Sequence, residues 1–150
     1  MNIAEMLKDI NKEINQKSLP KITSKNIMDD KHYGTTITDI EGMEEGSTEI
    51  LIFLKGSRTP RTCITLYHEQ DCCENVVVDQ VDGSVYRHIG ATIFAIREKV
   101  SYEEEGEDLE ICDDSNTWTF YDIETSKGRL SFRWHGSSNG YYSESVNIKQ

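Results

Sequence analysis

The residues from Leu66 to Glu74 read Leu-Tyr-His-Glu-Gln-Asp-Cys-Cys-Glu, the densest cluster of metal-capable and reactive side chains in the sequence. His68 and Cys72 are four positions apart, so one turn of helix would place both on the same side. Thiolate and imidazole ligands together favour zinc, which takes four donors in a tetrahedral shell. The cluster therefore predicts a structural zinc site. Its predicted ligands are His68, Cys72, Cys73 and Cys112, with Cys63 or His135 as alternative fourth donors.

The two adjacent cysteines leave other interpretations open. A disulfide between neighbouring residues closes a strained ring, so we expect Cys72 and Cys73 to be ligands or plain thiols. Buried thiols of this kind behave as small hydrophobic side chains. A cysteine beside a cationic His68 could instead be a nucleophile, although no residue that would orient the pair is identifiable. The nearby acids lack the spacing of a calcium loop, so we expect them to be solvated.

A second group of residues suited to binding lies between Arg133 and Ser143. Aromatic rings can stack on a small ligand while amides and hydroxyls orient it. The candidate ligand-binding residues are Arg133, Asn139, Tyr141 and Tyr142. The alternative is a hairpin whose rings pack in the core and whose Asn-Gly pair only forms the turn.

The chain is strongly acidic, with 27 Asp and Glu against 16 Lys and Arg and a net charge of −11 over 150 residues. This balance argues against direct binding of nucleic acid and is compatible with a basic protein partner. Tyr102–Asp114 holds eight acids and predicts an exposed loop. Its candidate partner-binding residues are Glu103, Glu104, Glu105, Glu107 and Asp108.

The first residues, Met1-Asn2-Ile3-Ala4-Glu5, lack the basic and apolar regions of a signal peptide, and no apolar run is long enough for a membrane span. We therefore expect a cytoplasmic protein, whose thiols stay reduced.

The elements that position these residues follow from the hydrophobic periodicity. Residues 3–14 predict an amphipathic helix, ended near Pro20. Alternating or β-branched runs predict strands around 35–40, 48–54, 61–67, 75–81, 91–100, 117–123, 130–135 and 141–148, and 84–89 predicts one helical turn. Tight turns between successive strands predict antiparallel pairing. The expected fold class is α+β, with one antiparallel sheet of six or seven strands and an N-terminal helix. Residues 1–45 would form the helix and lead-in strand, and 46–150 the β domain.

Three motifs in order, from His68 to Val76, from Thr117 to Tyr121 and from Arg133 to Ser143, resemble an uncharacterised family of small proteins in phages and prophages. The resemblance covers roughly Ile64 to Ile148, and it implies a phage origin but no activity. Relatives often carry another residue at His135, which weakens that position as an obligatory ligand. Small acidic phage proteins are often inhibitors of host defence, and anti-CRISPR inhibitors of Cas9 are the case that this chain most resembles.

The leading functional hypothesis is thus a non-enzymatic phage protein that binds a basic, nucleic-acid-handling defence protein, with a Cas9-type nuclease as the specific partner. The alternatives are a small-ligand binder, such as a sponge for a nucleotide defence signal, and a thiol enzyme that uses Cys72 or Cys73.

Overall fold

The structure is a computed structural model that describes residues 24–102 and 115–150. Its described elements are mostly strands, joined by one 3-10 turn, η1, and one short helix, α2. In chain order they are β1 (Lys25–Asn26), η1 (Asp30–His32), β2 (Thr36–Glu41), β3 (Glu49–Lys55), β4 (Thr62–Tyr67), β5 (Asn75–Asp82), α2 (Val85–His88), β6 (Ile93–Tyr102), β7 (Ser115–Thr125), β8 (Gly128–Ser138) and β9 (Asn147–Lys149).

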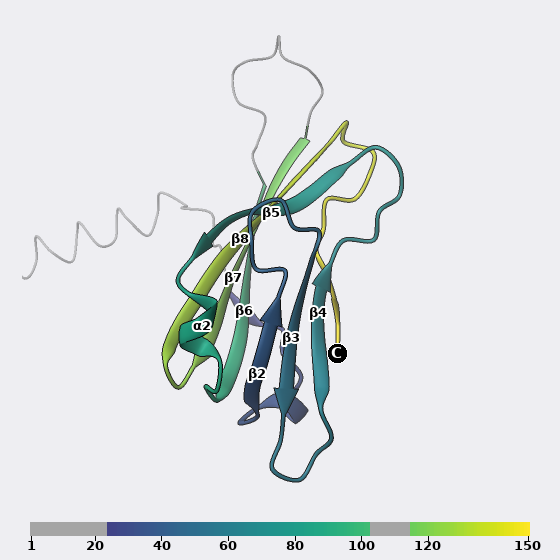
Figure 1. Cartoon of the computed structure of the whole chain (residues 1–150). Helices are drawn as coiled ribbons and strands as arrows, with labels where there is room; N and C mark the ends of the chain where they lie inside the picture. Colours follow the sequence, from purple (N-terminus) through teal and green to yellow (C-terminus); the bar gives the residue numbers. More distant parts are fainter. Residues whose placement is uncertain (1–23, 103–114) are drawn as a thin grey trace, which may run out of the picture.

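The strands form two antiparallel sheets. One sheet has five strands in the order β1-β6-β7-β8-β5, and the other has four in the order β2-β3-β4-β9. Figure 1 shows β2, β3 and β4 on one side of the molecule and β6, β7 and β8 on the other. The expected α+β fold with a single sheet is therefore wrong. The helix predicted over residues 3–14 lies outside the described residues.

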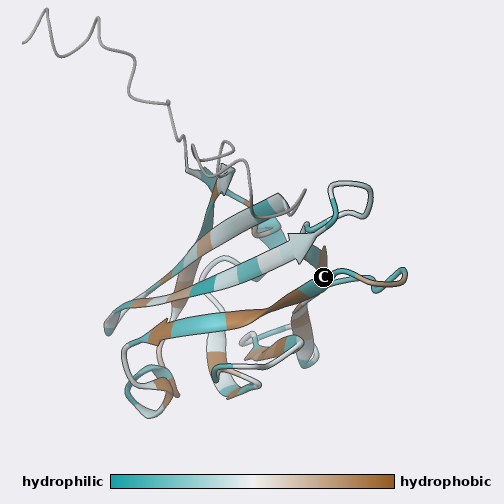
Figure 2. Ribbon diagram, turned by 90° about the horizontal axis from the view of Figure 1, so that it is seen from above, coloured by the Kyte–Doolittle hydropathy of each residue, from teal (hydrophilic) through white to brown (hydrophobic). Residues whose placement is uncertain are grey.

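Alternation along the strands explains the layering. On β8, Leu130, Phe132 and Trp134 are buried, as their spacing predicts, while the residues between them face outward. On β3, Ile50, Ile52 and Leu54 are fully buried and join the same hydrophobic cluster. Figure 2 shows apolar and polar residues alternating along the strands in this way. Because one cluster contains residues of both sheets, the core lies between them.

Two connections join consecutive strands that are not neighbours in a sheet. The chain from β5 passes through α2 to β6, yet β5 pairs with β8, which gives β5–β8 a Greek-key arrangement. The predicted helical turn at 84–89 is confirmed as α2. After β8, residues 139–146 leave the sheet and β9 pairs with β4, where Leu66 faces Ile148. The expected return strand over 141–148 therefore shrinks to three residues in the opposite sheet. No helix among the described residues is long and apolar enough to cross a membrane.

Candidate functional site

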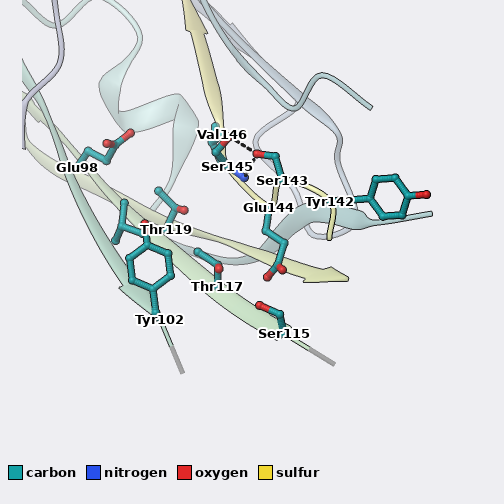
Figure 3. Close-up of a pocket in the computed structure, with 11 residues that line it drawn as sticks. Glu98, Tyr102, Ser115, Thr117, Thr119, Tyr142, Ser143, Glu144, Ser145 and Val146 are labelled. Carbon is teal, nitrogen blue, oxygen red and sulfur yellow. Dashed lines mark hydrogen bonds between the residues drawn. The ribbon is translucent and has the colours of Figure 1, made fainter. Parts of the chain in front are cut away.

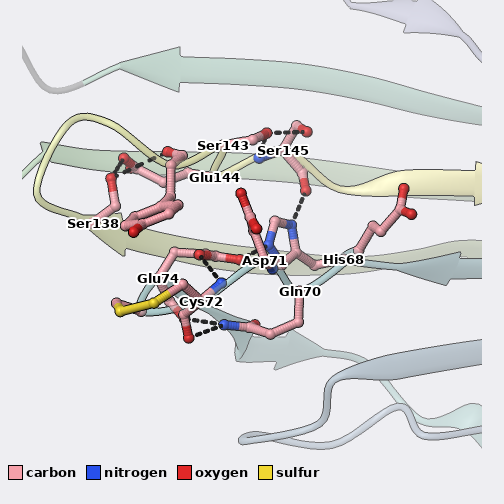
Figure 4. Close-up of polar contacts among 12 residues, drawn as sticks. His68, Gln70, Asp71, Cys72, Glu74, Ser138, Ser143, Glu144 and Ser145 are labelled. Carbon is pink, nitrogen blue, oxygen red and sulfur yellow. Dashed lines mark hydrogen bonds and ion pairs between the residues drawn. A yellow bond between two sulfur atoms is a disulfide. The ribbon is translucent and has the colours of Figure 1, made fainter.

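The loop between β4 and β5 folds around the carboxylate of Glu74 (Figure 4). Glu74 Oε1 accepts the backbone N–H of Asp71 at 2.6 Å and the Nε2–H of His68 at 2.9 Å. Glu74 Oε2 accepts the backbone N–H of Cys72 at 3.2 Å, and the Gln70 side chain donates to the Glu74 carbonyl at 2.7 Å. The bond from Asp71 and then that from His68 lower the pKa of Glu74 from 4.5 to about 2, although burial opposes the shift. Glu74 is thus an ionised anchor for the whole loop.

His68 extends this network to a distant segment. Its Nδ1 lies 2.7 Å from the backbone carbonyl oxygen of Ser145, and its side chain is almost fully buried. A carbonyl and a carboxylate only accept hydrogen bonds, so each ring nitrogen must carry a proton to bond its partner. The ring therefore bridges the Glu74 carboxylate and the Ser145 carbonyl. Both ring nitrogens are committed to structural bonds.

The adjacent cysteines depart from the sequence-based expectation. The sulfurs of Cys72 and Cys73 are joined in a disulfide, and both residues are exposed. The expectation that they stay unpaired is wrong for this structure. A disulfide carries no thiolate, so both nucleophilic chemistry and zinc binding would require its reduction.

The remaining proposed zinc ligands are dispersed. Cys112 lies outside the described residues, and Cys63 is a half-buried free thiol on β4. His135 on β8 bonds Asn116 through Nε2 at 2.9 Å and packs against the ring of Trp118. Within residues 24–102 and 115–150, no group of three or more His, Cys, Asp or Glu side chains is arranged to hold a metal ion. Zinc binding stays a prediction.

The predicted ligand surface around Arg133 is divided between two places. Arg133 donates two hydrogen bonds to Asp79, at 2.9 and 2.8 Å, and lies over the ring of Phe120 on β7. Tyr142 lines a separate pocket, whereas Tyr141 is 83% exposed in the turn after β8. Asn139 accepts the backbone N–H of Tyr141 and so serves the turn. The structure does not bring these four residues into one site.

The pocket that Tyr142 lines is a hollow of about 310 Å³ between β6, β7 and the segment 142–146 (Figure 3). Its lining includes many hydroxyl groups, two carboxylates and two tyrosines, of which Tyr102 turns its ring toward Thr117 and Thr119. Among its described lining residues none is Lys, Arg or His. The lining consists of Glu98, Val100, Tyr102, Ser115, Thr117, Thr119, Tyr142, Ser143, Glu144, Ser145 and Val146.

Glu144 is the most unusual group in this pocket. The residue is only 9% exposed, and its Oε2 accepts a hydrogen bond from the Ser138 hydroxyl at 2.6 Å. Its other oxygen, Oε1, is buried and has no hydrogen-bond partner among the described residues. Figure 3 shows the carboxylate pointing toward Thr117 and Ser115. A buried acceptor without a donor is uncommon in folded proteins.

Two contacts place Glu144 there. The first is the bond from His68 to the carbonyl of Ser145, its neighbour in the chain. The second is the close approach of Gly136 on β8, where an added Cβ would lie 2.7 Å from the Cβ of Glu144 and 2.8 Å from its carbonyl oxygen. Only glycine leaves room for the chain at this point. The His68–Glu74 loop thus holds one wall of the pocket.

Sequence reasoning missed the pocket, although one signal was present. Thr117 and Thr119 share a face of β7 with the buried Tyr121 and Ile123, so hydroxyls stand where a core strand would carry apolar groups. Glu144 had no such signal, because it follows a turn and lies outside any strand. The acids proposed as partner-binding, Glu103, Glu104, Glu105, Glu107 and Asp108, fall outside the described residues. Their segment begins after Tyr102 and ends before Ser115, both of which line the pocket.

Comparison with curated proteins finds no match, and comparison with solved structures finds none either. Residues 30–148 match the family model described as a domain of unknown function, DUF7448. This match begins before the stretch from Ile64 to Ile148 on which the sequence motifs lie, and it includes both β2 and β3. The fold and its pocket fall within it from residue 30 onward, and the chain belongs to the DUF7448 family.

Proposed function

We propose that the protein is a phage-encoded inhibitor of a host defence system, which binds a basic nucleic-acid-handling protein and blocks its engagement of DNA. A Cas9-type nuclease is the specific partner. The protein acts by binding and carries out no chemistry on its partner. Its negative charge competes with nucleic acid for a basic surface.

The observations that support the proposal are the net charge of −11 and the two acids that line the described pocket. The pocket between β6, β7 and the segment 142–146 presents Glu98 and Glu144. The sequence that joins the pocket residues Tyr102 and Ser115 adds eight more acids. A basic partner would be attracted by this negative charge, which speeds encounter and favours one orientation.

The hydrogen bonds of the 68–74 loop also favour binding over thiol catalysis. His68 and Glu74, which a thiol enzyme could use as base and orienting acid, bond each other and the backbone. The sulfurs of Cys72 and Cys73 bond each other. The reactive residue types of the loop are therefore used to hold it together.

Guided DNA cleavage by Cas9, measured at rising molar ratios of this protein, tests the proposal. We expect cleavage to fall as the ratio rises, and less inhibition at higher salt because exposed charges are screened. Unchanged cleavage at a large molar excess would rule out Cas9 as the partner.

A matched pair of variants tests the role of charge. The first replaces the proposed partner-binding acids Glu103, Glu104, Glu105, Glu107 and Asp108 with their amides. The control replaces five exposed acids elsewhere with their amides, namely Asp30, Glu41, Glu45, Glu49 and Asp82. Both variants lose the same charge, so inhibition lost only in the first assigns partner contact to the acidic segment.

A further inference from the structure

We infer that the pocket beside Glu144 is a binding site for a guanidinium or ammonium group. The inference rests on the proposed function in one respect: an arginine or lysine side chain of the basic partner would supply that group. The same chemistry is also present in free amines such as agmatine, so the pocket can be tested without the partner.

The negative charge of the pocket favours a positively charged ligand. It presents two carboxylates, and none of its described lining residues is cationic. Glu98 accepts a hydrogen bond from the hydroxyl of Tyr121 at 2.7 Å, so its charge is held at the pocket by a buried neighbour. An anion such as a phosphate would meet only negative charge here. A cation would be attracted.

The buried oxygen of Glu144 selects a hydrogen-bond donor. Its Oε2 is already bonded to Ser138, whereas Oε1 has no partner within the described chain. Thr117 and Thr119, both nearly buried, place hydroxyls along the same wall. A ligand with several N–H groups can donate to the carboxylate and to these hydroxyl oxygens at once. Guanidinium and ammonium groups have such donors.

The tyrosines favour the flat guanidinium. Tyr102 is 73% exposed at the end of β6, and Tyr142 is half-buried in the segment after β8. Both line the pocket, and Figure 3 shows the Tyr102 ring on the side of Thr117 and Thr119, so a cation that enters passes this ring. Guanidinium groups stack on such rings and bind carboxylates with two parallel hydrogen bonds. The volume of about 310 Å³ is at the small end of ligand pockets and suits a side-chain-sized group.

Contacts with other parts of the chain fix the position of Glu144 in the pocket. Ser138 fixes one oxygen of Glu144, Gly136 makes room for its backbone, and His68 holds the adjacent carbonyl of Ser145. These contacts come from one strand, β8, and from the loop after β4, which are far apart in sequence. A carboxylate fixed in this way binds a cation without first losing its own freedom of movement.

Calorimetric titration of the full chain with agmatine, putrescine, calcium chloride and glutamate tests the site directly. We expect heat with agmatine, weaker heat with putrescine and none with glutamate. Glu144→Gln should weaken agmatine binding about ten-fold or more, since a hydrogen bond to a charged group is lost. The matched control is Glu124→Gln. It removes a carboxylate of β7 that pairs with Arg97 of β6, away from the pocket, and should bind as the wild type does.

Folding is checked by circular dichroism, and Glu98→Gln and Tyr102→Ala test the same pocket if Glu144→Gln does not fold. Absence of heat with agmatine and putrescine at millimolar concentration, or equal affinity in every pocket variant, would overturn the inference. Heat with calcium alone would also overturn it.

The Cas9 cleavage assay then separates the two proposals. Parallel loss of agmatine binding and of inhibition in Glu144→Gln supports a partner side chain as the natural ligand. Loss of agmatine binding with full inhibition keeps the pocket but overturns the partner as its source. Inhibition by the wild type without any agmatine binding overturns the pocket and leaves the proposed function standing.

Discussion

The Nδ1–H of His68 donates to the carbonyl oxygen of Ser145 at 2.7 Å and thereby joins the end of β4 to the segment before β9. The Nε2–H of the same ring donates to Glu74, which directly precedes β5. One buried ring thus connects three parts of the chain. It also fixes the residue beside Glu144, so the cluster with the most reactive residue types serves to position a neighbouring pocket.

Replacement of His68 by alanine should destabilise the protein. It leaves the carboxylate of Glu74 and the carbonyl of Ser145 without their donors, and a loss of this kind lowers Tm by roughly 3–10 °C in a chain of this length. Thermal melts followed by circular dichroism measure the change. The control is His135→Ala, which removes a half-buried ring on the outer face of β8. Equal effects of the two substitutions would contradict a special role for His68.

Stability should depend on pH through Glu74. Its pKa is lowered on folding from 4.5 to about 2, so the folded state favours its ionised form. The stabilisation is therefore fully present above about pH 4.5 and is lost as the pH falls toward 2. Urea unfolding at a series of pH values should show this decline in the wild type. Glu74→Gln should be less stable at neutral pH and should show a flatter decline in the acid range.

Glu69→Gln, at an exposed position of the same loop, is the control for this titration and should keep the wild-type slope. If the slope of Glu74→Gln equals that of the wild type between pH 4.5 and 2, another group is responsible for the acid sensitivity.

Substitution of Gly136 by alanine should disturb the pocket by displacing Glu144. The new Cβ would lie 2.7 Å from the Cβ of Glu144, so the segment 142–146 must move away. Overpacking of this kind costs about 1–3 kcal/mol. We expect a lower urea midpoint and weaker agmatine binding. The control is Ser137→Ala, which adds no bulk to the same strand and should change neither quantity. Wild-type behaviour of Gly136→Ala would show that Gly136 and Glu144 are not closely packed.

The cysteines give a prediction that mass spectrometry can check. Under native, non-reducing conditions Cys72 and Cys73 should resist alkylation despite their exposure, because their sulfurs are bonded to each other. After reduction, two more adducts per chain should appear, and peptide mapping should place them at these residues. Alkylation of either residue without reductant would contradict the disulfide.

Zinc binding is tested on the reduced protein. If His68, Cys72, Cys73 and Cys112 form a site, elemental analysis should find one zinc per chain in the wild type and none in Cys72→Ser. Absence of zinc from the reduced wild type would remove the proposed site.

The strands could largely be predicted from the sequence, because alternation marks them directly. Leu130, Phe132 and Trp134 are buried on one face of β8, as their spacing indicates. The division into two sheets was not predictable in the same way. Asn139-Gly140 favours a turn, but a turn does not determine which strand the chain pairs with next. Here Ile148 pairs with Leu66 of the other sheet and packs against the shared hydrophobic core.

The site could be located from the sequence only in part. The cluster from His68 to Glu74 is a real structural centre, but its residue types suggested metal or thiol chemistry. Their hydrogen-bond partners, above all the backbone carbonyl of Ser145, carry no signal in the sequence. Glu144 shows the same limit, because its burial depends on a glycine eight positions earlier and on a histidine far away in the chain.

The central claim, that the protein keeps a basic partner from engaging DNA, is tested most directly by the fluorescence anisotropy of a labelled target DNA mixed with guide-loaded Cas9. Protein added before the DNA should prevent the rise in anisotropy. The amide variant of residues 103, 104, 105, 107 and 108 should lose this effect, and the control variant with five other acids changed should retain it. An unchanged rise in anisotropy at saturating wild-type protein would contradict the claim.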